Sequence, residues 1–416
     1  MLVAHKITLK PNKTQVEYFK RACGVSRFAY NWGLAKWIEQ HEAGLKPSKN
    51  KINKELNALK AEEFPWMYES PKRAPQEALV DLESAFKKLF KKQGGFPKFK
   101  KKGVRDSFRL DDGPGSNRPN AVIIEGKKLR LPKPRKSQIN PGWVRLTVEP
   151  RFKGQIKSAV ISRTAHRWFV SLTIDTTDIK PIKRENQAVG GVDLGVKYLA
   201  TANDGTFYEN HKALENNLKK LKRLQQKFSR QMKGSNRRYK NKQKIAKLHY
   251  KISCIRKDVL HKATIDLIRK YSIIGIEDLS VKNMMSDKTY ARLISDVGMY
   301  EFRRQLEYKG EWYGTEIVVA DKYFASTQLC SKCGFKNEKL KNNTSIRKWN
   351  CPDCGSHHDR DVNAAKNLAN NALRSVRPDV KLVETEVTTS KKREINAVDG
   401  TLWLYRMGRK PGALPN

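Results

Sequence analysis

The first hundred residues combine one strand-like segment with three segments of helical periodicity. Residues 2–9 have the length and composition of a short strand, whereas residues 14–42 repeat apolar side chains at helical spacing. The same spacing predicts helices at 51–60 and 76–92. The run QGGFPKFKKKG that follows is rich in Gly, Pro and Lys, which is typical of a boundary. We therefore predict a helical domain over residues 10–94.

Between residues 104 and 178 the pattern changes to short runs in which apolar and polar residues alternate. Turns rich in Gly, Pro and Asn separate these runs, which include AVIIEG, WVRLTVEP and RWFVSLTID. Such alternation predicts an antiparallel β domain built as a barrel. We expect the strand at residues 2–9 to join this domain. The β domain then comprises residues 1–9 and 95–182, and the helical domain is an insertion in it.

Two long amphipathic helices are predicted between residues 213 and 260, with a turn at Gly234, Ser235 and Asn236. Leucine and isoleucine recur at helical spacing in both arms of this hairpin. Residues 219–257 contain many Lys and Arg side chains but neither Asp nor Glu. A solvated basic coiled coil is the ordinary explanation of a charge run, but the complete absence of acids favours an anionic partner.

The whole chain shares this imbalance of charge. It has 416 residues, with 85 Lys and Arg against 42 Asp and Glu, and a formal net charge of +43. A charge of this size opposes compaction unless a polyanion neutralises it. No apolar run is long enough to span a bilayer, and the first residues lack the apolar core of a secretion signal. We therefore expect no membrane partner, a cytoplasmic location and binding to nucleic acid.

Two apolar strands each carry one acid on a face cleared of bulky side chains. The run AVGGVDLGVKYLATANDG predicts a strand hairpin in which Gly191, Asp193 and Gly195 share a face. The run YSIIGIEDLS repeats this design with Gly275 and Glu277. A carboxylate near the end of an apolar strand is costly to desolvate unless it is paired or bound to a metal.

A third acid lies at a predicted helix start, HHDRDVNAAKNLANNAL. Asp359 is a suitable N-cap, and Asp361 lies on the same helix face as Ala364, Ala365 and Leu368, which must pack inward. Taken singly, each of the three acids is more often capped or ion-paired. Their shared context favours two Mg²⁺ ions, which suit hard oxygen ligands and support phosphodiester hydrolysis.

Four cysteines form two C-x-x-C pairs separated by seventeen residues: Cys330, Cys333, Cys351 and Cys354. A glycine follows each pair and accommodates the tight turn around the sulfurs. This spacing predicts one structural Zn²⁺ with four sulfur ligands, which leaves no open position for catalysis. His357 or His358 could replace one cysteine, although contact with phosphate or a capping role suits these histidines better. The site precedes the helix of Asp361, so zinc should help to position that acid.

Two further groups have both structural and functional interpretations. Lys98, Lys100, Lys101 and Lys102 could grip phosphates or form a solvated loop. Tyr30, Asn31 and Trp32 could contact nucleic acid, but aromatic residues on a helix more often belong to a core.

Several motifs together resemble one known family. In order they are GVDLGVKYLATANDG, GIEDLS, ASTQLCSKCG with CPDCG, and DRDVNAAKN. They resemble TnpB, the RNA-guided endonucleases of bacterial and archaeal insertion-sequence transposons, which are related to type V CRISPR effectors. The similarity covers residues 188–375, and SRFAYNWGL and GFPKFKKKG also look like family motifs. The resemblance implies an RNase H-like RuvC domain in which Asp193, Glu277 and Asp361 bind metal and catalyse the reaction.

The resemblance also implies that the chain is a multidomain α+β protein. It implies that the β-barrel is a wedge domain and that its helical insertion, residues 10–94, is a recognition domain. The RuvC nuclease domain is expected over residues 187–324 and 357–380, with the four-cysteine zinc finger, residues 325–356, inserted in it. Residues 381–416 have weak periodicity, and we expect a partly disordered tail.

The function expected from this resemblance is guided DNA cleavage. A noncoding guide RNA from the transposon end would pair with double-stranded target DNA, and the protein would read a short flanking motif. We expect one protein per RNA, in association with the nucleoid. The alternatives are a guided DNA-binding repressor that no longer cuts, an RNase H-like transposase, and a structural RNA-binding protein.

Overall fold

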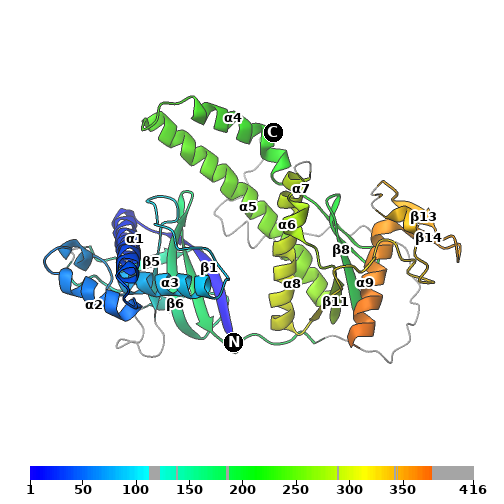
Figure 1. The fold of residues 1–416 in the computed structure, drawn as a ribbon, viewed down its shortest axis with the longest axis horizontal. Helices are drawn as coiled ribbons and strands as arrows, with labels where there is room; N and C mark the ends of the chain where they lie inside the picture. Colours follow the sequence, from blue (N-terminus) through cyan, green and yellow to red (C-terminus); the bar gives the residue numbers. More distant parts are fainter. Residues whose placement is uncertain are drawn as a thin grey trace, which may run out of the picture. The chain divides into compact units, whose positions relative to one another are not determined.

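The computed structural model describes residues 1–111, 122–136, 139–183, 187–287, 290–341, 343 and 345–376. The predicted tail, residues 381–416, lies outside the described residues. The chain divides into two units, of which the first comprises Met1–Asp178 and the second begins at Ile179. Both units mix helices and strands (Figure 1). In the part of the chain described, no helix is both long and apolar enough to cross a bilayer.

The first unit contains a seven-stranded antiparallel sheet with the strand order β2-β6-β7-β1-β5-β4-β3. The N-terminal strand β1 lies inside this sheet, where it pairs with β7 from Leu2↔Asp175 to Leu9↔Trp168 and with β5 at Leu9↔Leu146. The pairings between described residues form an open order, with β2 and β3 at its ends, so closure into a barrel stays a prediction. The strands are β1 (Leu2–Lys10), β2 (Ser107–Asp111), β3 (Ile123–Glu125), β4 (Lys128–Arg130), β5 (Trp143–Leu146), β6 (Gln155–Thr164) and β7 (Arg167–Asp175).

Three helices lie between β1 and β2 in the chain: α1 (Lys13–Glu42), α2 (Lys49–Leu59) and α3 (Arg73–Phe90). A capping box begins α1, because the Asn12 side chain accepts from the backbone of Gln15 and the Gln15 side chain accepts from the backbone of Asn12. Leu34, Leu56 and Leu82, one from each helix, are buried in a shared core. The helices predicted from periodicity are therefore confirmed, with shifts of up to three residues at their ends.

The side chain and backbone of Lys100 make contacts within the first unit, and its contact with phosphate stays a prediction. Its ammonium group lies 3.7 Å from the centre of the Tyr30 ring. The Asn31 side chain is hydrogen-bonded to both the backbone N–H and the carbonyl of Lys100. Burial lowers the pKa of Lys100. Tyr30, Asn31 and Lys100 therefore fasten the 98–102 segment to α1.

The second unit is built around a five-stranded sheet with the order β10-β9-β8-β11-β12. Strands β8, β11 and β12 are parallel, and β9 and β10 continue the sheet in antiparallel fashion. A separate two-stranded ribbon, β13 with β14, follows. These strands are β8 (Val189–Leu194), β9 (Tyr198–Ala202), β10 (Phe207–Glu209), β11 (Ile273–Ile276), β12 (Glu316–Val319), β13 (Lys348–Asn350) and β14 (His357–Asp359).

The two faces of this sheet pack against different helices (Figure 1). On one face Val192, Ile274 and Ile276 join a core that includes Leu260 and Phe302 of the long helices. The other face, bare at its glycines, meets α9. The helices are α4 (Leu218–Ser229), α5 (Asn236–Lys270), α6 (Val281–Met284), α7 (Ala291–Val297), α8 (Met299–Tyr313) and α9 (Arg360–Val376).

The predicted basic hairpin is confirmed as α4 and α5, with the Ser235 side chain capping α5 by accepting from Arg238. Leu221, Leu248 and Ile252 are buried between the two helices. The second helix is longer than predicted and ends at Lys270 rather than near residue 260. The apolar spacing continues through Leu267, and this last part of α5 packs under the sheet.

Candidate metal centres

Asp193 and Glu277 lie at the carboxyl ends of two adjacent parallel strands. The register between β8 and β11 pairs Gly191 with Gly275 and Val192 with Ile276. Each acid is the next residue in its chain, so the two occupy neighbouring positions at one edge of the sheet. Adjacent strands are about 4.8 Å apart. Because side chains alternate along a strand, the acids share the face of the two glycines.

Helix α9 lies directly on these glycines. A Cβ atom added at Gly191 would collide with the carbonyl oxygen of Ala365, and one added at Gly275 would collide with that of Leu368. Asp361 precedes Ala365 by four residues, a rise of about 6 Å along a helix. The two-residue step from Gly191 to Asp193 covers about 6.6 Å of strand. The close packing therefore brings the first turn of α9 level with the acids of the sheet.

The start of α9 is fixed by the predicted N-cap. Asp359 Oδ1 accepts from the backbone N–H groups of Asp361 and Val362, at 3.1 Å each. This cap satisfies two donors that a helix start leaves unpaired, and its negative charge suits the positive end of the helix dipole. Asp359 thus orients the turn that carries Asp361 and is not itself on the glycine face.

The three carboxylates are close enough to repel one another. Burial raises the pKa of Asp193 well above its usual value, and the charges of Glu277 and Asp361 raise it further. Burial also raises the pKa of Glu277. Within the described residues, no hydrogen-bond donor contacts the Asp193 carboxylate. The site therefore concentrates negative charge that the surrounding side chains neutralise only in part.

Sequence reasoning did not identify the partners of these acids. Ser326 Oγ donates a hydrogen bond to Glu277 Oε1. Arg347 Nη1 lies 3.2 Å from both oxygens of Asp361, and the charge of Arg360 lowers the pKa of Asp193 and of Glu277. Arg360 lies in the DRDVNAAKN motif and Ser326 in ASTQLCSKCG, but spacing alone does not say which acid they meet.

The arrangement has the donor chemistry of a site for hard divalent cations. All three side chains are carboxylates, and their mutual repulsion would be relieved by an ion. Their oxygens do not all lie within 4.8 Å of one another; among described residues only the four cysteines form such a group. The oxygens of the three carboxylates are therefore more widely spaced than those of the sulfur cluster.

The four cysteines meet as the spacing predicted. Their sulfurs all lie within 4.8 Å of one another, with Cys330 Sγ and Cys354 Sγ 3.6 Å apart and Cys333 Sγ and Cys351 Sγ also 3.6 Å apart. Four sulfurs around one zinc at about 2.3 Å would lie roughly 3.8 Å apart. The site can hold a structural metal ion with the geometry of zinc.

Two matching turns shape this sulfur cluster. The backbone N–H of Gly334 donates to the carbonyl of Cys330, and that of Gly355 donates to the carbonyl of Cys351. Both glycines have positive φ angles, of 80° and 67°, which other residues rarely adopt. His358 Nε2 lies 3.0 Å from Cys330 Sγ, so it contacts a sulfur while all four cysteines remain in the cluster. His357 contacts Asn350 Oδ1 instead.

Two buried asparagines join the sulfur cluster to α9. Asn363 Oδ1 accepts from the backbone of Ser331, and its Nδ2 donates to the carbonyl of Leu329. Asn367 Nδ2 donates to the carbonyls of Ser326 and Leu329. The chain between Ser326 and Ser331 thus carries the Glu277 contact at one end and the first cysteine pair at the other. The cluster and the carboxylates are parts of one hydrogen-bonded structure.

Comparison with protein families gives three matches along the chain. Residues 171–287 match the family OrfB_IS605, described as "Probable transposase". Residues 300–368, which include the four cysteines, match "Cas12f1-like, TNB domain". Residues 1–46 match a family described as "Helix-turn-helix domain", and in this structure they form β1 and the single long helix α1.

Curated relatives resemble almost the whole chain. "Putative RNA-guided DNA endonuclease InsQ" of Escherichia coli K12 is 35% identical over 384 residues, which cover 88% of this chain and 91% of that relative. "Putative RNA-guided DNA endonuclease" of Streptomyces pristinaespiralis is 34% identical over 371 residues, 88% of each chain. Among solved structures, a Cas12f1–sgRNA–target DNA complex has a similar fold, with a TM-score of 0.52 at 18% identity over 86% of this chain and 82% of that one.

The sulfur cluster predicts a measurable zinc content. Purified protein should contain about one zinc ion per chain by elemental analysis, and Cys351→Ser should lose most of it. We expect this variant to unfold at a lower temperature, because a structural zinc site contributes directly to folding. Cys23→Ser, which changes a cysteine outside the cluster, should keep its zinc. Equal zinc in both variants would contradict the assignment.

The crowded carboxylates predict that Asp193→Asn stabilises the protein in magnesium-free buffer. Asn keeps the shape but removes a charge that burial and two neighbouring acids oppose, so the free energy of unfolding should rise by about 1 kcal/mol. The gain should be absent below the ordinary Asp pKa of 3.8 and grow as the pH rises towards the higher folded-state value. Thermal unfolding at pH 3.5 and 7.5 measures it. A lower melting temperature of Asp193→Asn than of the original protein at pH 7.5 would contradict this, because it would show that the surrounding groups stabilise the Asp193 charge.

Proposed function

Because the chain belongs to the TnpB (OrfB_IS605) family, we propose that it is an RNA-guided DNA endonuclease. A noncoding RNA from the transposon pairs with the target, and the protein cuts complementary double-stranded DNA beside a short flanking motif. Base pairing reads the sequence in this scheme, while the protein recognises the flanking motif and the shape of the heteroduplex. The formal net charge of +43 suits a protein that holds two polyanions.

One observation carries this proposal: three crowded carboxylates gather at the edge of the second sheet. Asp193, Glu277 and Asp361 come from β8, the end of β11 and α9, and α9 can approach only because Gly191 and Gly275 lack side chains. We assign the three acids as ligands of two Mg²⁺ ions and as the catalytic residues of a RuvC-type domain. When bound, such ions activate a water molecule and stabilise the leaving oxygen of the phosphodiester.

The surrounding side chains prepare this site. Ser326 holds Glu277 by one oxygen and leaves the other available. Arg347 donates to both oxygens of Asp361, so it competes with an ion for this acid. Arg347 is exposed and, once displaced by an ion, is free to contact a phosphate of the DNA. Arg360 adds positive potential beside Asp193 and Glu277, which favours a phosphate at the same edge.

The zinc site has a structural role in this proposal. Four sulfur ligands leave no open position for substrate, so the ion supplies no chemistry to the reaction. The segment folded around the ion instead sets where Arg347 and α9 lie relative to the sheet. Asn363 and Asn367 make this connection through their hydrogen bonds. We propose one protein per guide RNA, acting in the cytoplasm at the nucleoid.

The family description "Probable transposase" supports a second candidate function. A transposase of RNase H type would use a similar triad of acids to cut and join the transposon ends, and it would need no guide. A guided repressor that no longer cuts is a weaker candidate, because all three acids are present. A requirement for RNA therefore distinguishes a guided nuclease from a transposase.

The proposal predicts RNA-dependent cleavage. The protein should copurify with a noncoding RNA, and with Mg²⁺ the complex should cut a plasmid that carries the complementary sequence beside a library of flanking motifs. Asp193→Ala should reduce cleavage by roughly a thousandfold or more, because it removes a shared ligand of both ions, and should leave RNA and DNA binding within a few-fold.

Two controls test whether cleavage depends on these particular acids and on RNA. Asp278→Ala removes a carboxylate next to Glu277 that is ion-paired with Arg303 of α8, so it should retain most of the cleavage. Ribonuclease treatment before addition of DNA should abolish cutting. Cleavage without RNA, or joining of transposon ends without RNA, would replace this proposal with the transposase.

A further inference from the structure

The helical hairpin of the second unit carries an unusual division of charge. We define the basic arm as residues 218–257, which comprise α4, the turn and the first part of α5. It contains sixteen Lys and Arg residues and no acid. Fourteen of the sixteen are exposed, and only Arg238 and Arg256 are half-buried. The two kinds of position have different roles.

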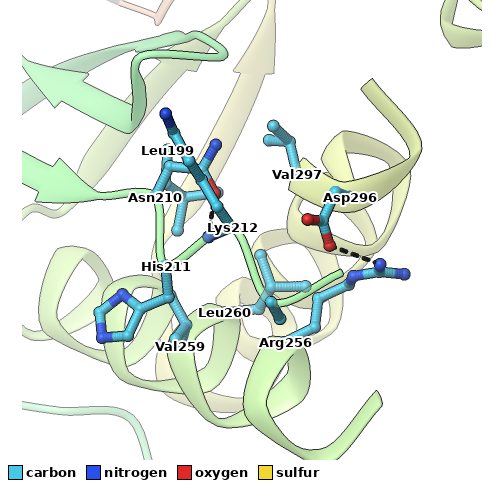
Figure 2. A pocket seen from close by; sticks show the side chains of 10 residues that line it. Leu199, Asn210, His211, Lys212, Arg256, Val259, Leu260, Asp296 and Val297 are labelled. Carbon is cyan, nitrogen blue, oxygen red and sulfur yellow. Dashed lines mark hydrogen bonds and ion pairs between the residues drawn. The ribbon is translucent and has the colours of Figure 1, made fainter. Parts of the chain in front are cut away.

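The two half-buried arginines hold the arm together. Arg238 Nη1 donates to the carbonyls of Phe228 and Gln231, at 2.8 and 2.6 Å, and its guanidinium lies 4.0 Å from the centre of the Phe228 ring. It thereby closes the end of α4 onto α5. Arg256 Nη2 donates to Asp296 Oδ1 at 2.7 Å (Figure 2). Both arginines are used within the protein.

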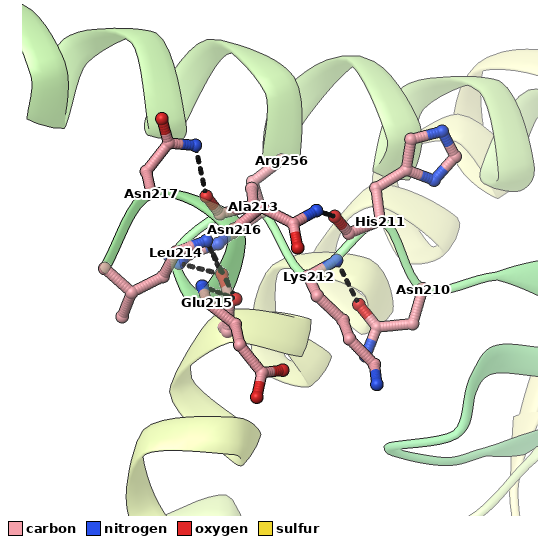
Figure 3. A network of polar contacts seen from close by, with 10 residues as sticks. Asn210, His211, Lys212, Ala213, Leu214, Glu215, Asn216, Asn217 and Arg256 are labelled. Atoms are coloured by element: carbon pink, nitrogen blue, oxygen red, sulfur yellow. Dashed lines mark hydrogen bonds and ion pairs between the residues drawn. The ribbon is translucent and has the colours of Figure 1, made fainter. Parts of the chain in front are cut away.

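The foot of the arm is joined to the core by the buried Asp296. The buried Asp296 carboxylate accepts from the backbone N–H groups of Leu214 and Glu215 as well as from Arg256. Figure 3 shows Leu214, Glu215 and Arg256 gathered at this joint. The neighbouring cavity, partly lined by Lys212, Arg256 and Asp296, has a volume of about 10 Å³, which is about the space that one water needs. The hydrogen bonds of Asp296 fix the arm to the core of the second unit.

The fourteen exposed cations have no anionic partner in the part of the chain that the structure describes. Five of them follow one side of α5 at alternating spacings of three and four residues: Arg237, Lys240, Lys244, Lys247 and Lys251. This stripe is about 21 Å long at the rise of an α-helix. Exposed Lys and Arg side chains without acids repel one another, and this repulsion destabilises the arm. An extended anion lying along the stripe would remove the repulsion.

We propose that the basic arm binds the backbone of a base-paired segment of the guide RNA. This inference rests on the proposed function, and it names the surface that would retain the guide. Among the Phe, Tyr and Trp residues of the arm, all of which the structure describes, only Tyr239 is exposed. Proteins that grip single strands use several aromatic platforms, whereas a duplex is recognised through its phosphates and shape. RNA suits the arm better than target DNA, because the guide is present before any target arrives and so neutralises the arm at all times.

A binding experiment with charge variants tests this proposal. Lys240, Lys244, Lys247 and Lys251 are changed together to Gln in one variant and to Arg in a control that keeps the charge. The probe is a fluorescent RNA hairpin of about 20 base pairs, with a DNA hairpin of the same sequence as the comparison, in magnesium-free buffer at several salt concentrations. The Gln variant should lose RNA affinity by about tenfold or more, and the slope of log affinity against log salt should fall by about 3.

The Arg control should retain the affinity and slope of the original protein, and thermal unfolding should show that both variants fold. An RNA affinity within about twofold of the original for the Gln variant would overturn the proposal. A loss confined to the DNA hairpin would do the same and would assign the arm to the target. The assay requires no cleavage, so a failure of guided cutting and a failure of the arm to bind RNA are separate results.

Discussion

The close approach of α9 to the sheet of the second unit is the constraint on which the candidate site depends. The backbone carbonyls of Ala365 and Leu368 occupy the space where side chains at positions 191 and 275 would lie. Any residue larger than glycine at either position would push the helix away and carry Asp361 with it. The two glycines therefore set the distance between the acid on the helix and the two acids on the strands. The positions of the three acids therefore depend directly on how α9 packs on the sheet.

The close packing of α9 also explains why the three carboxylates at the edge of the sheet repel one another. Three carboxylates crowd together, and burial together with mutual repulsion raises the pKa of Asp193. The structure around them supplies rigidity more than neutralisation. Asp359 fixes the first turn of α9, Ser326 holds Glu277, and the asparagines at 363 and 367 tie the helix to the sulfur cluster. A bound cation would relieve this repulsion, which suits the metal-dependent cleavage that we propose.

Much of this organisation could be predicted from the sequence because it follows from periodicity and spacing. The strands of Asp193 and Glu277, the N-cap at Asp359, the meeting of four cysteines and the basic hairpin all have local patterns. The contacts of Ser326, Arg347 and Lys100 could not be predicted, because each joins segments that are separated in the chain. The length of α5 was underestimated for a related reason: beyond residue 260 its apolar side packs on a sheet that local periodicity does not reveal. Barrel closure in the first unit and the domain boundaries remain predictions.

The most direct measurement of the central claim is a crystal structure of the purified protein soaked with Mn²⁺, with anomalous diffraction used to locate the metal. Our account predicts two manganese peaks roughly 4 Å apart, with Asp193 as a ligand of both and with Glu277 and Asp361 each contacting at least one. Arg347 should have released Asp361 in that structure. Peaks located only at the four cysteines, or none within reach of the three carboxylates at millimolar Mn²⁺, would contradict the account.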